Sequence, residues 1–176
     1  GVRPYPYKFD EFASLDRTLC FSQIVDRKRQ YLLENIDSVD FMGRMEFGGK
    51  FAKDNPNYKG EVIREKLNEF ITCYSNMALL SEVENTTPLV IKEGLICGLG
   101  IVCSETITPE LDTSLPWIDV IPENKINNLS YVLEVIENNK KVSKQHRKEI
   151  REYGINQFGL ENILAYEYIP KLESLL

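Results

Sequence analysis

Histidine and long apolar runs are both scarce in this sequence of 176 residues. The only histidine, His146, lies in the charged stretch SKQHRKE, so we expect a solvated surface residue and no Ser/His/Asp or Cys/His catalytic constellation. No apolar run approaches the roughly 18 residues that a membrane span needs, and no charged-then-apolar leader opens the chain. We therefore expect a soluble chain, although a longer parent chain could associate with a membrane elsewhere.

The cysteines lack the spacing of a metal site or a redox pair. They lie in apolar stretches without a CxxC pair: Cys20, Cys73, Cys97, Cys103. Free cysteines in such positions are usually buried core residues. The sequence thus predicts reduced thiols, no bound metal and a reducing compartment, which indicates a cytoplasmic location.

Basic residues are outnumbered by acidic ones. Lys and Arg total 21 against 27 Asp and Glu, which gives a net charge of −6. Attraction of the whole chain to nucleic acid is therefore not expected, whereas a local basic site remains possible. The length and the 43% hydrophobic content suit one domain with a single core.

Apolar stretches alternate with amphipathic ones along most of the chain. Residues 1–17, rich in proline and aromatics, are interpreted as an extended lead-in or linker, and residues 18–176 as the domain. The alternation predicts an α/β fold, a parallel sheet with helices on both faces. We expect strands over 18–24, 39–43, 76–81, 100–104 and 117–121, and helices over 26–36, 61–74, 87–98 and most of 126–176, with interruptions near Gly154, Gly159 and Pro170.

The helix over 87–98 carries one unexpected charge, Glu93, among apolar residues. Thr87 and Pro88 indicate its start, Thr87 as a cap and Pro88 as the first helical residue. Its amino end should face the carboxyl edge of the sheet, where open α/β folds bind ligands and where free N–H groups attract phosphate. Glu93 lies close enough to that end to accept hydrogen bonds from ribose hydroxyls. The alternative is that Glu93 pairs with a cation or lies in a solvated gap.

The helix expected over 26–36 begins with cations. Asp26 is a good cap, yet Arg27, Lys28 and Arg29 fill the first turn, where the helix dipole disfavours positive charge. Such a violation of a local rule often marks a functional site, and these cations would neutralise a diphosphate. A solvated basic turn is the alternative. The glycine-rich segment 43–60 is either functional or mobile.

The stretch ENTTPLVIKEGLICGLGIVCSE, residues 84–105, resembles the signature of the C-terminal, donor-binding domain of GT-B glycosyltransferases of the glycogen-synthase-like group 1. Upstream, FSQIVDRK resembles the family's glycine-arginine pair followed by a lysine, and VDFMG resembles its strand that ends in phenylalanine and glycine. The likeness covers residues 18–105. It implies a Rossmann-like domain that is one half of a two-domain enzyme, with the acceptor-binding N-terminal domain missing from this chain.

The resemblance also implies roles for individual residues. Glu93 matches the glutamate on the ribose, Lys28 the lysine on the donor diphosphate, and Glu84 the glutamate on the transferred sugar. Lys28 and Glu84 are thus the candidate catalytic residues. The remaining candidates for donor binding are Gln23, Arg27, Gly43, Arg44, Asn85, Thr86, Thr87, Pro88 and Leu89.

Two departures from the family pattern bear on these roles. The gap between Glu84 and Glu93 is one residue longer than usual, so that exact spacing would fall on Asn85. Gln23 stands where the family has arginine. A neutral Gln23 can still donate hydrogen bonds, but the positive charge on the diphosphate would come from Lys28 and a neighbouring arginine.

The implied function is to bind a nucleoside-diphosphate sugar and, in a complete enzyme, to transfer its sugar to an acceptor hydroxyl with retention of configuration. The family usually needs no metal, and we expect no cofactor apart from the sugar nucleotide as substrate. The isolated chain should bind the donor and transfer little. Two alternatives stay open: one half of a sugar-nucleotide epimerase, and a non-catalytic nucleotide-binding or interaction module of the same fold.

Overall fold

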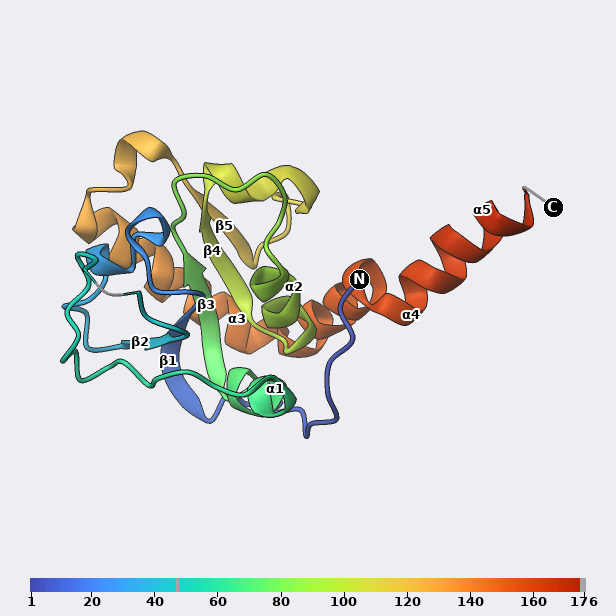
Figure 1. Cartoon of the computed structure of the whole chain (residues 1–176), viewed down its shortest axis with the longest axis horizontal. Coiled ribbons are helices and arrows are strands. Elements are labelled where there is room, and N and C mark those ends of the chain that lie inside the picture. The colour runs from blue at the N-terminus through green and yellow to red at the C-terminus, as the bar shows by residue number, and fades with distance from the viewer. Residues whose placement is uncertain (47, 175–176) are drawn as a thin grey trace.

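A parallel sheet forms the centre of the chain in a computed structural model, which describes residues 1–46 and 48–174 (Figure 1). The strands stand in the order β2-β1-β3-β4-β5, and all neighbouring pairs run parallel. Their bounds are β1 Leu15–Phe21, β2 Val39–Met42, β3 Tyr74–Leu79, β4 Gly100–Ser104 and β5 Ile118–Ile121. The predicted α/β fold and all five predicted strands are confirmed, with shifts of up to three residues at their ends.

The order of the strands reverses between β1 and β3. From β1 the chain moves outward to β2, then crosses to β3 and continues in the opposite direction to β4 and β5. Beyond β2, residues 57–60 add an extended segment, in which Lys59 N donates to Phe41 O (2.8 Å) and Gly43 N donates to Gly60 O (2.9 Å). Part of the segment 43–60 therefore covers the outer edge of the sheet, although Phe47 within it lies outside the described residues.

Helices cover both faces of the sheet. On one face, α1 (Leu67–Ile71) and α2 (Leu89–Ile96) pack on a buried cluster that includes Met77 and Ile101. On the other face, the first turns of α3 (Leu129–Phe158) pack through Ile136 on a second cluster that includes Val102. Apolar side chains of successive strand residues enter opposite clusters, because side chains of a strand alternate between its two faces.

The helix α3 then passes beneath the amino ends of the strands and reaches the opposite face. Three buried polar residues spaced four apart make this passage: Asn139 donates to Ile101 O (3.2 Å), Ser143 to Ser75 O (2.5 Å), and Arg147 to other backbone carbonyls. These bonds satisfy strand ends that the sheet leaves unpaired. Because α3 occupies the amino edge, the carboxyl edge is the one left open, and this is the edge at which open α/β sheets bind ligands.

Several predicted helices are shorter or differ in kind. Residues 26–36 form two single 3-10 turns, Asp26–Lys28 and Gln30–Leu32, because Arg29 between them adopts a left-handed backbone with φ of 56°. The helix predicted over 61–74 is reduced to a 3-10 turn, Arg64–Lys66, followed by α1.

The long C-terminal helix also differs from its prediction. Gly154 does not interrupt α3. Its missing side chain instead lets α3 approach α2 closely, since a Cβ there would lie 2.5 Å from Leu95 C. The distortion falls instead at His146. The prediction of a solvated His146 is wrong in part, since its ring is half-buried, 5.7 Å from the ring of Trp117, and it is paired with Glu149.

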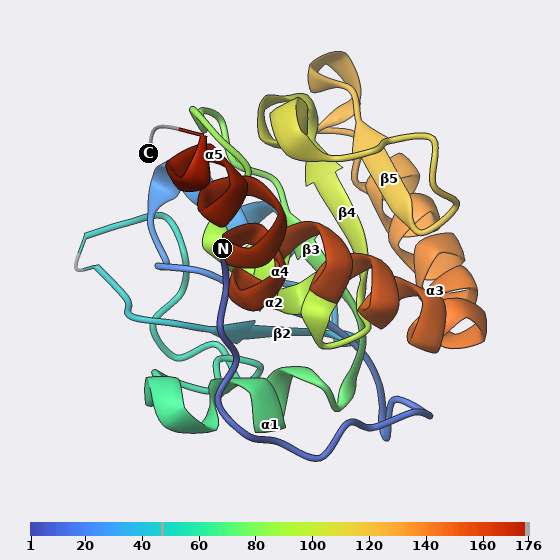
Figure 2. The ribbon, with the colours of Figure 1, turned by 90° about the vertical axis from the view of Figure 1, so that its right-hand side faces the viewer.

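The chain ends lie on one side of the molecule. The lead-in runs past α1 and α2, and Val2 N donates to Phe158 O (2.7 Å) where α3 ends (Figure 2). Gly159 ends α3 as predicted, and α4 (Leu160–Ile163), a π-helical turn (Leu164–Tyr168) and α5 (Ile169–Glu173) then project away from the sheet. The last two residues of the predicted domain, Leu175 and Leu176, lie outside the described residues. Within the described residues, none of the helices combines the length and apolar character that a membrane span requires.

Candidate functional site

The candidate site lies where the strand order reverses. In open α/β sheets this point leaves a crevice at the carboxyl ends of the two strands between which the order changes. Here these strands are β1 and β3, and the loops that follow them are residues 22–29 and 80–88. Glu82 N donates to Arg27 O (2.8 Å), so that the two loops are joined directly by their backbones.

The structure brings Arg27, Lys28 and Glu84 together at this point. Lys28 Nζ donates to Glu84 Oε1, and the Arg27 guanidinium lies 3.8 Å from the same oxygen. The side chain of Lys28 is only 9% exposed and that of Glu84 15%, whereas the side chain of Arg27 is 54% exposed. The basic turn is therefore not a solvated one as a whole, because its central lysine is nearly enclosed.

Arg29 turns away from this cluster and fixes the loop. Its Nη1 donates to both carboxylate oxygens of Glu123 (3.1 and 2.9 Å), and its Nε contacts Glu82 at 3.4 Å. Arg29 thus ties the loop after β1 to the loops after β3 and β5. The interpretation of Arg29 as a further cation for a diphosphate is not supported, because its charge is already paired with two carboxylates.

Glu93 is buried at the second turn of α2. It is 4% exposed, and it pairs with the guanidinium of Arg64, whose Nη2 lies 3.4 Å from Oε1. Burial raises the pKa of Glu93 above its ordinary value, and the positive charge of Arg64 opposes that shift. The alternative that Glu93 pairs with a cation is therefore present. Because Arg64 is mostly exposed, however, its charge offsets only part of the free-energy cost of burying the Glu93 carboxylate.

The start of α2 differs from the prediction in its cap. Pro88 is the N-cap residue with an extended backbone, and no side chain caps the helix. Thr87 is buried and donates to Ile107 O (3.0 Å) instead, because the loop after β4 passes beside it. The backbone N–H groups of Leu89 and Val90 therefore remain available to an anion. Asn85 and Thr86 in the preceding loop are exposed.

The other predicted residues lie beside this crevice. Gln23 donates to Glu46 (2.5 Å), and Arg44 is exposed, with its carbonyl accepting from Ile24 N (2.8 Å). Gly43 has a φ of 137°, and a Cβ there would lie 2.0 Å from Ser22 O, so only glycine lets the loops after β1 and β2 approach this closely. The structure does not direct Gln23 toward the Lys28 cluster, since its amide is taken by Glu46.

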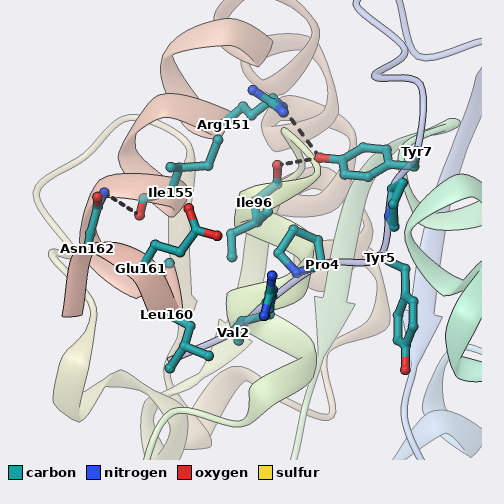
Figure 3. Close-up of a pocket in the computed structure, with 13 residues that line it drawn as sticks. Val2, Pro4, Tyr5, Tyr7, Ile96, Arg151, Ile155, Leu160, Glu161 and Asn162 are labelled. Atoms are coloured by element: carbon teal, nitrogen blue, oxygen red, sulfur yellow. Dashed lines mark hydrogen bonds between the residues drawn. The ribbon is translucent and has the colours of Figure 1, made fainter. Parts of the chain in front are cut away.

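Sequence reasoning missed the partners of the charged residues. Arg64 lies 29 positions before Glu93, and Glu123 lies 94 positions after Arg29, so neither pair leaves a local signal. A hollow of about 470 Å³ elsewhere was also not predicted (Figure 3). It lies between the lead-in and the end of α3, where Tyr7 donates to Ile96 O (2.9 Å) and burial raises the pKa of Tyr7 to about 12. Ile96 is the last residue of α2, so this hollow is at the opposite end of the helix from Leu89.

The potential metal ligands among the described residues are scattered. Nowhere in ranges 1–46 and 48–174 do three His, Cys, Asp or Glu side chains gather in a way that could hold a metal ion. The cysteines Cys20, Cys73, Cys97 and Cys103 are free thiols. Burial raises the pKa of Cys97 to about 11 and that of Cys103 to about 12, so neither is a reactive thiolate near neutral pH.

Comparison with solved structures finds this fold in glycosyltransferases. HepE from Anabaena, solved in complex with UDP, is similar at a TM-score of 0.66 with 14% identity, over 93% of this chain and 50% of that one. Sucrose-phosphate synthase from Thermosynechococcus elongatus gives 0.68 and 16% over 93% and 47%. The catalytic domain of cholesterol-alpha-glucosyltransferase from Helicobacter pylori gives 0.58 and 15% over 81% and 98%. No protein-family model matches the sequence, and no curated sequence matches it either.

These likenesses define the fold class. The chain has a Rossmann-like domain of the kind found in GT-B glycosyltransferases, as the resemblance of residues 18–105 predicts. It spans about half the length of HepE, 50% of that chain. At identities below 20% the likeness establishes the fold, and the activity of the chain is argued from its own residues.

Proposed function

We propose that this chain is the donor-binding domain of a glycosyltransferase that takes its sugar from a nucleoside-diphosphate sugar. The observation that carries the proposal is the nearly enclosed Lys28, held at the point of strand reversal with Arg27 beside it. A buried cation at the carboxyl edge of an open α/β sheet suits an anionic ligand. The UDP complex of HepE supports the same ligand class, since the two proteins share this fold.

Each residue has a definite role in this proposal. Lys28 and Arg27 stabilise the diphosphate as the bond to the sugar breaks, because they place positive charge where negative charge develops. The free N–H groups at the start of α2 contribute to the same anion site. Glu93 accepts hydrogen bonds from the ribose hydroxyls, and Glu84 accepts from hydroxyls of the transferred sugar. No metal is invoked for neutralising the diphosphate.

The proposal extends to the enzyme of which this domain would be a part. A second domain, facing the carboxyl edge of the sheet, would supply the acceptor hydroxyl, and transfer would retain the anomeric configuration. A cytoplasmic location belongs to the same proposal, since free thiols persist in a reducing compartment. The chain alone binds the donor and transfers little.

The test is a calorimetric titration with UDP-, GDP-, ADP- and TDP-sugars. We expect one nucleotide class to bind, and Lys28→Ala and Glu93→Ala each to weaken it by about 1–3 kcal/mol, the cost of losing a hydrogen bond to a charged group. Lys144→Ala and Glu65→Ala are the matched controls, since both are exposed and remove the same charges. Unchanged affinity in both site variants would contradict the proposal. Conversion of the donor with no acceptor present would indicate an epimerase instead.

A further inference from the structure

The negative charge that Lys28 contacts comes from the protein itself. Lys28 and Arg27 are both directed at one oxygen, Oε1 of Glu84. Among the described residues, no other carboxylate pairs with either cation. Glu84 therefore occupies the position on Lys28 that the proposed function gives to a phosphate oxygen.

A diphosphate bound to Lys28 would lie close to the Glu84 carboxylate. Like charges repel strongly in a partly buried site, where water screens them little. Binding of the diphosphate therefore favours a position of Glu84 away from Lys28. A carboxylate that leaves a cation gains a favourable new position only if other hydrogen-bond donors replace it.

The loop that holds Glu84 is fixed at both ends, where Glu82 N also donates to Arg27 O (2.8 Å), and is largely exposed between them. Ser81 O accepts from Ser104 Oγ (2.6 Å) and Thr106 Oγ1 (2.8 Å), and Thr87 is anchored to Ile107 O. Between these anchors Val83 is 65% exposed, and Asn85 and Thr86 are exposed as well. A segment with few buried contacts reorganises at low cost, so Glu84 can move while the ends of the loop stay in place.

We propose, on the basis of the proposed function, that Glu84 is a specificity residue that exchanges between Lys28 and the sugar of the donor. A nucleoside diphosphate that carries a sugar displaces Glu84 and offers it hydroxyl donors in return. A nucleoside diphosphate without the sugar displaces Glu84 but provides no sugar hydroxyl that could donate a hydrogen bond to it. The site therefore selects the donor over the nucleotide that remains after transfer.

The test compares each nucleotide with its sugar ester. Dissociation constants of UDP and UDP-glucose, and of the corresponding ADP, GDP and TDP pairs, are measured for the unmodified chain, Glu84→Gln and Glu82→Gln. We expect Glu84→Gln to bind the free nucleotide about tenfold more tightly, the usual scale of a close charge interaction, and the ratio of the two constants to approach one. Glu82→Gln removes the same charge from the same loop. Because Glu82 pairs with Arg29 and not with Lys28, the ratio of the two dissociation constants should not change in this variant.

A double-mutant cycle isolates the pair. In a Lys28→Met background, Glu84→Gln should change the affinity for the free nucleotide much less, because the pairing with Lys28 is already absent and only the 3.8 Å contact with the exposed Arg27 remains. Free-nucleotide affinity that is unaltered or weakened by Glu84→Gln alone would overturn the exchange and leave the donor site standing. If neither nucleotide nor sugar nucleotide binds to the folded chain, as judged by circular dichroism, the proposed function itself fails. Glu84→Ala serves as a second variant should Glu84→Gln fold poorly.

Discussion

Replacing Glu93 by glutamine should stabilise the domain and weaken its binding of nucleotide. Glu93 is 4% exposed, and Arg64 Nη2 lies 3.4 Å from its Oε1, with the Arg64 side chain 61% exposed. At that distance Coulomb's law gives roughly 5 kcal/mol at an effective dielectric constant of about 20 and roughly 1 kcal/mol in water. Because Arg64 is mostly in solvent, the pair contributes near the lower value.

The cost of burying the charge is larger than this gain. Removing a carboxylate from water costs several kcal/mol, and a neutral amide of the same shape avoids that cost while adding a desolvation penalty of about 1–3 kcal/mol. The net expectation for Glu93→Gln is an unfolding free energy higher by about 1 kcal/mol, which corresponds to about 2–4 °C in the melting temperature of a chain of this size. Nucleotide affinity should fall about tenfold, since a charged acceptor is lost.

Thermal unfolding and calorimetric titration of Glu93→Gln, with Glu65→Gln as the exposed control, measure both quantities. Higher stability together with weaker binding identifies a charge that is kept for its ligand. The reasoning is refuted if the variant melts at a lower temperature and binds nucleotide as before, because Glu93 would then be a structural charge.

Three further outcomes follow from the packing and the pKa shift. The pKa of Glu93 is raised above 4.5 in the folded state, so the folded chain keeps this proton to a higher pH than the unfolded chain does. The free energy of unfolding should therefore fall as the pH rises from 4.5 through the raised pKa, and the stability advantage of Glu93→Gln should vanish below pH 4.5. Nucleotide binding, which needs the carboxylate, should weaken as the pH falls through that same raised pKa. Gly154→Val should cost about 1–3 kcal/mol or more in chemical unfolding, since its Cβ would lie 2.5 Å from the backbone of Leu95. Glu152→Val, at an exposed position of the same helix, is the comparison, and an equal loss in both would show that the close approach is unimportant. Asn139→Ala should destabilise by about 1–3 kcal/mol because it removes the buried hydrogen bonds that Asn139 makes with Asn76, Asp119 and the carbonyls of Ile101 and Trp117. A change below about 0.5 kcal/mol in urea unfolding would contradict the role given to this residue.

The spacing of polar residues in α3 shows how far local patterns reach. Asn139, Ser143 and Arg147 recur every four residues, which places them on one side of a helix. The pattern does not say that this side crosses the amino ends of the strands, because that requires the positions of Ser75 and Ile101 in the assembled sheet. The same holds for Arg29, whose left-handed backbone divides a predicted helix. In that conformation Arg29 forms ion pairs with Glu82 and Glu123, which lie on two loops that only the fold brings together.

By itself, the sequence determined the succession of strands and helices along the chain, the carboxyl edge as the predicted place of the candidate site, and the prominence of Lys28 and Glu93. Alternation of apolar and amphipathic stretches is a local property, and a charge within an apolar helix is visible without coordinates. Tertiary structure alone decided that Lys28 meets Glu84 and that Glu93 meets Arg64. The physical reason is that ion pairs depend on distances between loops, and those distances are set by strand order and by the path of α3, which no short stretch of residues encodes.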